Sequence, residues 1–273
     1  MNYNEGDIRF LRNMNVFMFD LDGCLYYQNR PAQGAAELLR LLQEVEKQIR
    51  FVTNNSRESA SDIAVKLRSM SIPAEAEQVI SAAEGTAVYL HERYGAVKVK
   101  VAGSDGFAAL LRQSGHEVLS WEDSRTADCV AIGRDTDFTY DRLLKIANET
   151  RLGAALLAAN PDLYHPGASG ERIPETGALS AAIEAVTGRE IPYVGKPSPY
   201  LFQLAVRNVP ASPETSVMIG DNPWTDIAGG QRAGLRTVWL HNGQPDYPDG
   251  LKPPDLAAAD AAELLAIYEK LRS

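Results

Sequence analysis

Cysteine is scarce in this chain: Cys24 and Cys129 are the only two among 273 residues, and they form no C-x-x-C pair. A zinc ribbon or a disulfide-stapled scaffold needs more cysteines at closer spacing, so the sequence gives no support to either class. Two isolated thiols are typical of a reducing compartment, and the cytoplasm is therefore the predicted location. Histidine is nearly as rare. The four residues have no metal-ligand spacing, which predicts surface or packing roles for His91, His116, His165 and His241.

Positive charge is also in short supply, because 27 lysines and arginines face 36 aspartates and glutamates, for a net charge of −9. Phosphate backbones demand clustered Lys and Arg, so no nucleic-acid partner is expected. No apolar run approaches the roughly 18 residues that a membrane span requires. The first fifteen residues also lack the basic-then-apolar layout of a signal peptide. We therefore expect no membrane partner.

The remaining composition is that of an ordinary globular protein, with 45% hydrophobic and 23% charged residues. At roughly 150 residues per domain, the length suggests two domains or one large one. Short apolar runs alternate with amphipathic stretches from the start: residues 16–20 and 49–55 read as buried strands, and 34–48 and 56–70 as helices. This β-α-β-α order predicts a parallel sheet with right-handed crossovers.

The middle of the chain repeats the pattern with different pieces. Strands are predicted at 97–103, 127–133 and 154–160, with helices at 105–115 and 139–151. From Gly188 the first pattern resumes, with strands at 192–195, 215–221 and 236–240 and helices at 199–208, 224–234 and 260–273. The predicted fold class is α/β: a Rossmann-like, doubly wound parallel-sheet core at 1–81 and 179–273, with an inserted α/β cap domain at 82–178.

Two aspartates end the first apolar run, in the sequence VFMFDLDGC. Asp20 and Asp22 point the same way while the strand lasts, and Gly23 permits a sharp exit. Adjacent carboxylates repel each other, so a divalent cation, a shared proton or a catalytic role usually compensates. The alternative is a solvated strand end with a helix-capping aspartate.

Two more polar sites follow strand-like segments. Thr53, Asn54 and Asn55 come at the end of FVTNN, where hydroxyl, amide and backbone N–H groups suit phosphoryl oxygens. The alternative for this segment is a helix N-cap at Ser56. Lys196 follows the predicted strand at 192–195 and could neutralise a phosphoryl group as a point charge, although most lysines are merely solvated.

The fourth site is GDNPWTD, where Asp221 ends an apolar strand and Asp226 lies five residues later, at the start of the next predicted helix. Mg²⁺ prefers oxygen ligands, takes only a few carboxylates and keeps several waters. Asp-Asn-Pro is also turn chemistry, but a turn does not account for the second aspartate. In doubly wound sheets, ligands bind at the carboxyl ends of the strands, which is where all four sites are expected.

The four blocks FDLDGC, VTNN, GKPSP and GDNPWTD resemble, in order, the four motifs of the haloacid dehalogenase (HAD) superfamily of aspartate-nucleophile phosphotransferases. The size and position of the insertion, with AANPD and ETGAL, resemble the type IIA branch of NagD-like and p-nitrophenylphosphatase-like enzymes. The resemblance implies a Mg²⁺-dependent phosphatase of small phosphorylated metabolites. One departure is Cys24, where many members have Thr. A packing role is the interpretation preferred over an oxidation-sensitive thiol.

The resemblance also implies a role for each residue. Asp20 is the nucleophile that forms an aspartyl-phosphate, and Asp22 is the general acid and base. The predicted metal ligands are the Asp20 carboxylate, the Asp22 carbonyl and Asp221. Asp226 is expected to contact the metal through a water molecule or to contact its ligands, and Asn222 is a weaker candidate. The groups that hold or surround the phosphoryl oxygens are Thr53, Asn54, Asn55, Lys196 and Gly23.

The inserted domain is expected to close over the site and to contact the leaving group. The candidates for this contact are Arg134, Asp135, Asn160 and Asp162, and the resemblance also allows a homodimer through the cap. A dehalogenase would not need Asp22 or the metal pair. The competing predictions are a phosphotransferase or mutase on the same scaffold, and a catalytically silent module that binds phosphorylated metabolites. A silent module would be expected to lack one of four motif residues, and none is missing: Asp20, Asp22, Lys196 and Asp221.

Overall fold

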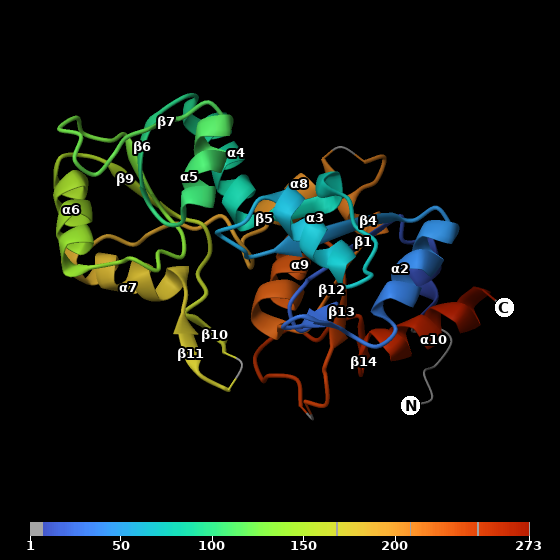
Figure 1. Ribbon diagram of the computed structural model, residues 1–273. Helices are drawn as coiled ribbons and strands as arrows, with labels where there is room; N and C mark the ends of the chain where they lie inside the picture. Colours follow the sequence, from blue (N-terminus) through green and yellow to red (C-terminus); the bar gives the residue numbers. More distant parts are fainter. Residues whose placement is uncertain (1–7, 168, 208, 245, 273) are drawn as a thin grey trace. The chain divides into compact units, whose positions relative to one another are not determined.

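The computed structural model describes residues 8–167, 169–207, 209–244 and 246–272, and it divides into two compact units (Figure 1). The core unit contains residues 1–53, 60–80 and 197–273, and the inserted unit contains 54–59 and 81–196. Residues 1–7, on which part of the signal-peptide prediction depends, lie outside the described ranges. Within those ranges no helix has both the length and the apolar character needed to cross a membrane.

The core unit is built on a six-stranded sheet of order β14-β13-β12-β1-β4-β5, in which β14, β13, β12, β1 and β4 pair in parallel. Three of these strands matter for function: β1 (Val16–Phe19), β4 (Gln48–Thr53) and β12 (Ser216–Gly220). All four residues of β1 and all five of β12 are buried. Strands covered on both faces read as continuous apolar runs, which is why the sequence predicts them. The other strands are β5 (Val79–Ser81), β13 (Arg236–Leu240) and β14 (Leu256–Ala258).

Helices cover both faces of this sheet. On one face, α2 (Ala35–Glu44), α3 (Ala60–Ser69) and α10 (Ala261–Arg272) bury their apolar sides against alternate strand residues such as Phe17 and Phe19. On the other, α9 (Ala228–Arg232) brings Gly230 against Met218 and Thr237, and α8 (Tyr200–Val206) packs near β4. A short hairpin, β2 (Tyr26–Tyr27) and β3 (Arg30–Pro31), follows β1, and the short helical turns η1 (Arg9–Asn13), η2 (Ala76–Gln78) and η3 (Pro213–Thr215) complete the unit. The predicted doubly wound core is therefore confirmed.

The inserted unit has a parallel four-stranded sheet of its own, with order β7-β6-β8-β9. Its strands are β6 (Lys98–Ala102), β7 (Glu117–Val118), β8 (Cys129–Ile132) and β9 (Ala155–Ala158). Its helices are α4 (Ala82–Tyr94), α5 (Asp105–Gln113), α6 (Tyr140–Arg151) and α7 (Thr176–Thr187), and β10 (Tyr164–Pro166) pairs with β11 (Arg172–Pro174) as a hairpin. The side chains of Ser81, Ser104 and Thr139 accept backbone N–H groups at the N-caps of α4, α5 and α6 and fix where these three helices begin.

Two predictions about this region differ from the structure. The expected return to the core at residue 179 comes too early, because Ile183 of α7 and the later Ile191 are buried in the hydrophobic cluster of the inserted unit. The strand predicted at 192–195 is a single bridge between Tyr193 and Ala158. Pro192 lacks an N–H group, so only its carbonyl and the Val194 N–H bond to Ala158.

Candidate active site

Three predicted site residues meet at the carboxyl edge of the core sheet. Asp20 directly follows β1, Thr53 is the last residue of β4, and Asp221 directly follows β12. Since β1 pairs with both β12 and β4, these residues come from adjacent parallel strands. The Asp20 N–H still donates to the Ile219 carbonyl at 2.9 Å, so the hydrogen bonding between β1 and β12 continues as far as Asp20. This is the edge at which doubly wound sheets bind ligands.

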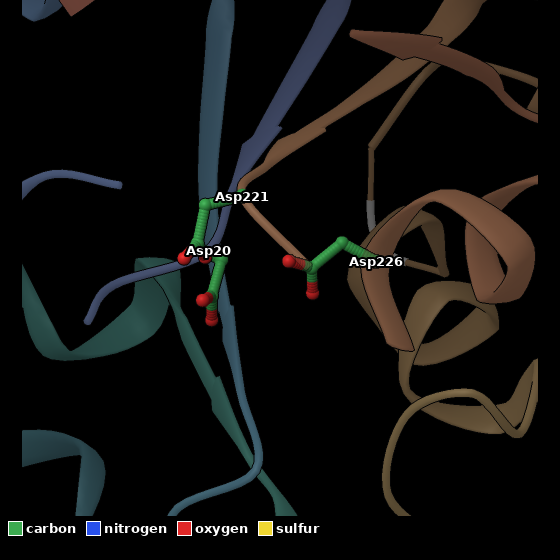
Figure 2. A group of neighbouring side chains, drawn as sticks. All are labelled: Asp20, Asp221 and Asp226. Atoms are coloured by element: carbon green, nitrogen blue, oxygen red, sulfur yellow. The ribbon is translucent and has the colours of Figure 1, made fainter. Parts of the chain in front are cut away.

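Three carboxylates form a cluster at this edge, called here the carboxylate cluster: Asp20, Asp221 and Asp226 (Figure 2). One ligand oxygen from each lies within 4.8 Å of the others. Asp20 and Asp221 come from the ends of the strands, and Asp226 points toward them from the helical segment that follows β12. Asp226 is fully buried, while the other two are half-buried.

Asp226 is positioned by an unusual turn. The predicted helix at 224–234 begins as a π-helical turn, η4 (Pro223–Ile227), and continues as α9. The side chain of Asn222 caps this turn, because its Oδ1 accepts from the N–H groups of Trp224 and Thr225 at 2.9 and 3.2 Å. The Asn222 N–H in turn donates to Asp226 Oδ2 at 3.1 Å. Asn222, predicted as a weak metal ligand, instead uses its side-chain oxygen to shape the loop that carries Asp226.

The residues of the carboxylate cluster fit a hard divalent cation. Three carboxylates at this separation repel one another, and the burial of Asp226 makes that repulsion more costly, so a bound cation or a shared proton would offset it. The donors are all carboxylate oxygens, the ligand type that Mg²⁺ takes in small number. The side chain of Asp22 is not among the carboxylates of the cluster, and a contact of its backbone carbonyl with the metal stays a prediction.

Asp22 has a separate environment. Its side chain is exposed, and its Oδ2 accepts a hydrogen bond from the hydroxyl of Tyr26 at 2.9 Å. Gly23 turns the chain between them with φ +80, and its N–H donates to the Tyr26 carbonyl at 2.9 Å. Cys24 is buried in the core cluster with Sγ 3.7 Å from the Ile219 carbonyl, which is a packing position.

Sequence reasoning missed several residues that support this edge. Asn242 donates to the Gly23 carbonyl at 2.7 Å, and Trp239 donates through its ring N–H to the Asp221 carbonyl at 2.9 Å. Trp239 belongs to β13, and Asn242 lies two residues after its end, so Asn242 is a polar residue that follows a predicted strand. Tyr27 lies nearby: partial burial raises its pKa, and the negative charge of Asp221 raises that pKa further.

A second group of predicted residues meets inside the inserted unit. Asn54 Oδ1 accepts from the Lys196 N–H at 2.7 Å, and Asn54 Nδ2 donates to the Lys196 carbonyl and to Asp162 Oδ2, each at 3.0 Å. Asn160 completes the arrangement by donating to the Asn54 carbonyl at 2.6 Å. The amide of Asn54 therefore holds the backbone of Lys196, whose side chain is buried. Asn160 and Asp162, predicted to contact the leaving group, form hydrogen bonds with Asn54.

The N-cap predicted at Ser56 is wrong. Helix α3 begins at Ala60, and Ser56 Oγ instead accepts from the Arg134 N–H at 3.0 Å and lies 3.2 Å from Thr176 Oγ1. Asn55 caps the local turn, since its Oδ1 accepts from the N–H groups of Arg57 and Glu58 at 2.8 and 2.9 Å. The Asn55 side chain is thus used for backbone geometry.

The other two residues predicted to contact the leaving group, Asp135 and Arg134, have different surroundings. Asp135 is buried, pairs with Arg142 at 2.9 Å, and accepts from the Asp137 N–H, so it maintains the loop after β8. Arg134 lies 3.3 Å from Glu175, and the same carboxylate oxygen contacts His165 Nδ1 at 2.6 Å. These three polar side chains are only partly buried and form a charged group beside the β10–β11 hairpin.

Comparison with known proteins identifies the family of the chain. A family model described as haloacid dehalogenase-like hydrolase matches residues 17–117, and one described as HAD-hydrolase-like matches 193–264. The two matches contain all four motifs. The chain belongs to the haloacid dehalogenase-like hydrolases, in the type IIA branch.

Individual relatives cover most of the chain. It is 30% identical to the acid sugar phosphatase of Staphylococcus haemolyticus, over 90% of this chain and 91% of that protein. It is 36% identical to mouse chronophin, over 81% and 78% respectively. The solved 4-nitrophenylphosphatase of Thermotoga maritima superposes with a TM-score of 0.86 at 30% identity, over 94% of this chain and 98% of that one. The predicted enzyme class, an HAD-type phosphatase, is confirmed.

Proposed function

We propose that this chain is a Mg²⁺-dependent phosphatase that hydrolyses small phosphomonoesters through an aspartyl-phosphate on Asp20. The observation that carries the proposal is the carboxylate cluster at the ends of β1 and β12. A bound Mg²⁺ would neutralise charge between the anionic nucleophile and the anionic phosphate. Asp20 and Asp221 would hold it, with Asp226 fixing the geometry from the π-helical turn and the Asp22 carbonyl as a further ligand.

In the proposed reaction the two motif aspartates have different roles. A carboxylate oxygen of Asp20 attacks phosphorus, and the bond from phosphorus to the leaving oxygen breaks. Asp22 gives its proton to that oxygen and then accepts a proton from the water that hydrolyses the aspartyl-phosphate. Thr53 lies on the next strand and contributes a hydroxyl for the phosphoryl oxygens. In this proposal Lys196 neutralises the phosphoryl group, while the Asn54 amide keeps its backbone in place.

We also propose that the inserted unit is a cap that closes over the site, excludes water from the first step and contacts the leaving group. Arg134 is its best candidate for that contact, because its charge is partly exposed, whereas Asp135, Asn160 and Asp162 are engaged in holding loops. The names of the relatives support small phosphorylated metabolites, sugar phosphates among them, as substrates. A homodimer through the cap and a cytoplasmic location stay predictions.

The first test is hydrolysis of p-nitrophenyl phosphate with Mg²⁺ and with EDTA. We expect activity only with the metal. We expect Asp20→Asn to lose essentially all turnover while it folds normally, because no neighbouring group replaces the covalent step. Glu44→Gln, an exposed carboxylate at the end of α2, is the matched control and should keep wild-type activity. Near-wild-type turnover by Asp20→Asn would refute the mechanism, and no metal-dependent turnover by the wild type would favour a silent binding module.

A further inference from the structure

Tyr26 and Lys66 form a hydrogen-bonded series that ends on Asp22. Tyr26 is the first residue of β2, and its side chain is buried, with an exposed fraction of 3%. Its hydroxyl donates to Asp22 Oδ2 at 2.9 Å. Lys66, on α3, places Nζ 3.3 Å from the Tyr26 hydroxyl and 4.6 Å from the centre of its ring. Nothing in the four sequence motifs accounts for either residue.

The direction of these hydrogen bonds follows from the groups themselves. A lysine ammonium has three donors and no acceptor, so the Tyr26 oxygen accepts from Lys66. A phenol has one hydrogen, which the geometry directs to Asp22 Oδ2. This bond fixes the orientation of the Asp22 carboxyl group, and because protonation of Oδ2 would weaken Oδ2 as an acceptor, it favours Oδ1 as the oxygen that carries a proton.

The backbone reinforces this arrangement. The Tyr26 carbonyl accepts from the Gly23 N–H at 2.9 Å, and the Tyr26 N–H donates to the Leu21 carbonyl at 3.3 Å. Tyr26 therefore holds both the loop that carries Asp22 and one oxygen of its carboxyl group. The cation of Lys66 above the ring and beside the hydroxyl keeps the phenol from rotating away.

We propose that Tyr26 and Lys66 are positioning residues that orient Asp22, so that the proton on Oδ1 faces the leaving oxygen. The inference depends on the proposed function, in which Asp22 is the general acid. In that step the Asp22 Oδ1–H bond breaks as the leaving oxygen takes the proton and the electron pair of its bond to phosphorus. Asp20 forms the new bond to phosphorus. Tyr26 keeps its own proton throughout, and the attacking water later returns a proton to Oδ1.

The role of the acid depends on the leaving group, which gives a specific test. Nitrophenolate is stable as an anion at neutral pH and leaves without help, whereas the less acidic phenol of phenyl phosphate leaves well only when it is protonated. Misorientation of Asp22 should therefore slow phenyl phosphate much more than p-nitrophenyl phosphate. A variant that only loosens the fold would slow both substrates by the same factor.

The experiment measures kcat and KM of wild type, Tyr26→Phe, Lys66→Met and Lys66→Arg on p-nitrophenyl, phenyl and p-methoxyphenyl phosphate. General acid catalysis contributes about 10²–10⁴-fold, so we expect Tyr26→Phe to lose roughly tenfold more kcat/KM on phenyl phosphate than on p-nitrophenyl phosphate, because kcat/KM reports the step in which the leaving oxygen departs. Lys66→Met should show the same dependence on the leaving group more weakly. Lys66→Arg should behave like the wild type because arginine also donates. Tyr268→Phe, another buried tyrosine of the core unit, is the control and should show no dependence on the leaving group.

The outcomes separate the two proposals. Equal losses of kcat/KM on all three esters, or no loss in Tyr26→Phe, would overturn the positioning role while the phosphatase mechanism stands. A wild type without metal-dependent turnover on any ester would instead overturn the proposed function, and this inference with it. Thermal melting of each variant shows whether it folds. If Tyr26→Phe melts at a lower temperature than the wild type, Lys66→Met takes its place in the comparison. Lys66 lies on α3, outside the loop that carries Asp22, and its loss removes the hydrogen bond to the Tyr26 hydroxyl.

Discussion

Two carboxylates of the cluster pack against the backbone at Gly23 and Gly220, where no side chain is in the way. A Cβ built on Gly23 would lie 2.4 Å from Asp221 Oδ2, and one on Gly220 would lie 2.2 Å from Asp226 Oδ2. Such contacts are impossible without displacement, so a side chain at either position would move a carboxylate of the cluster. Gly23 also has φ +80, which side chains rarely adopt. These glycines are thus part of the site's geometry as well as of its turns.

We expect Gly23→Ala to lose activity by at least about a hundredfold, because a shift of roughly 1 Å in a catalytic group can cost that much. The positive φ should lower the free energy of unfolding by only about 1–2 kcal/mol, so the protein stays folded. Steady-state kinetics and urea unfolding measure the two effects. Gly243→Ala is the control: its φ is +80 as well, but nothing lies within 4 Å of its Cβ position. A similar loss of activity in both variants would mean that backbone strain, and not the displaced carboxylate, is responsible.

At the level of elements, a buried ion pair joins β6 to α6 in the inserted unit. Lys100 Nζ lies 2.5 Å from Glu149 Oε1, and the two side chains are 3% and 11% exposed. Lys100 also donates to the Asp123 carbonyl at 3.0 Å, and Glu149 Oε2 accepts from the Ala127 N–H at 2.9 Å. Removing one partner of such a pair leaves an uncompensated buried charge, whereas replacing both is often nearly neutral.

We therefore expect Lys100→Met to lower the free energy of unfolding of the inserted unit by about 3–5 kcal/mol. The double variant Lys100→Met/Glu149→Gln should recover most of this loss, since glutamine can still accept from the Ala127 N–H without carrying a charge. A double-mutant cycle by urea unfolding measures the coupling. Additive losses would show that the two charges do not stabilise each other.

The elements also show what the sequence could and could not predict. β1 and β12 were predictable because strands buried on both faces are continuous apolar runs, and the polar residue after each run is visible. The boundary at 178 was wrong because α7 and the core helices have the same apolar pattern, and only packing shows which sheet Ile183 faces. The bond from Asn242 to Gly23 joins residues 219 positions apart, so no local pattern reveals it. Tyr26 lies four residues from Asp22, yet its role depends on where the loop turns its hydroxyl.

At the level of the whole molecule, each of the two units has a hydrophobic cluster of its own among the described residues. The core unit has its own cluster around Phe17, Phe19 and Phe51, and the inserted unit has another around Val130, Ile132 and Ile146. All three carboxylates of the cluster belong to the core unit. A ligand that binds only the folded state stabilises the unit that binds it, so Mg²⁺ should act on one core and not on the other.

We expect two calorimetric unfolding transitions, of which Mg²⁺ raises only the one that belongs to the core unit. At a metal concentration of 100 times Kd, the gain is about 2.7 kcal/mol, which corresponds to roughly 5–10 °C for a unit of this size. Asp221→Asn should remove most of this shift, and it should also make the metal-free core unit more stable, because one of three repelling charges is gone. Lys100→Met identifies the other transition by lowering it. If Mg²⁺ raised both transitions equally, or if Asp221→Asn kept the full shift, the metal would bind elsewhere than at the carboxylate cluster.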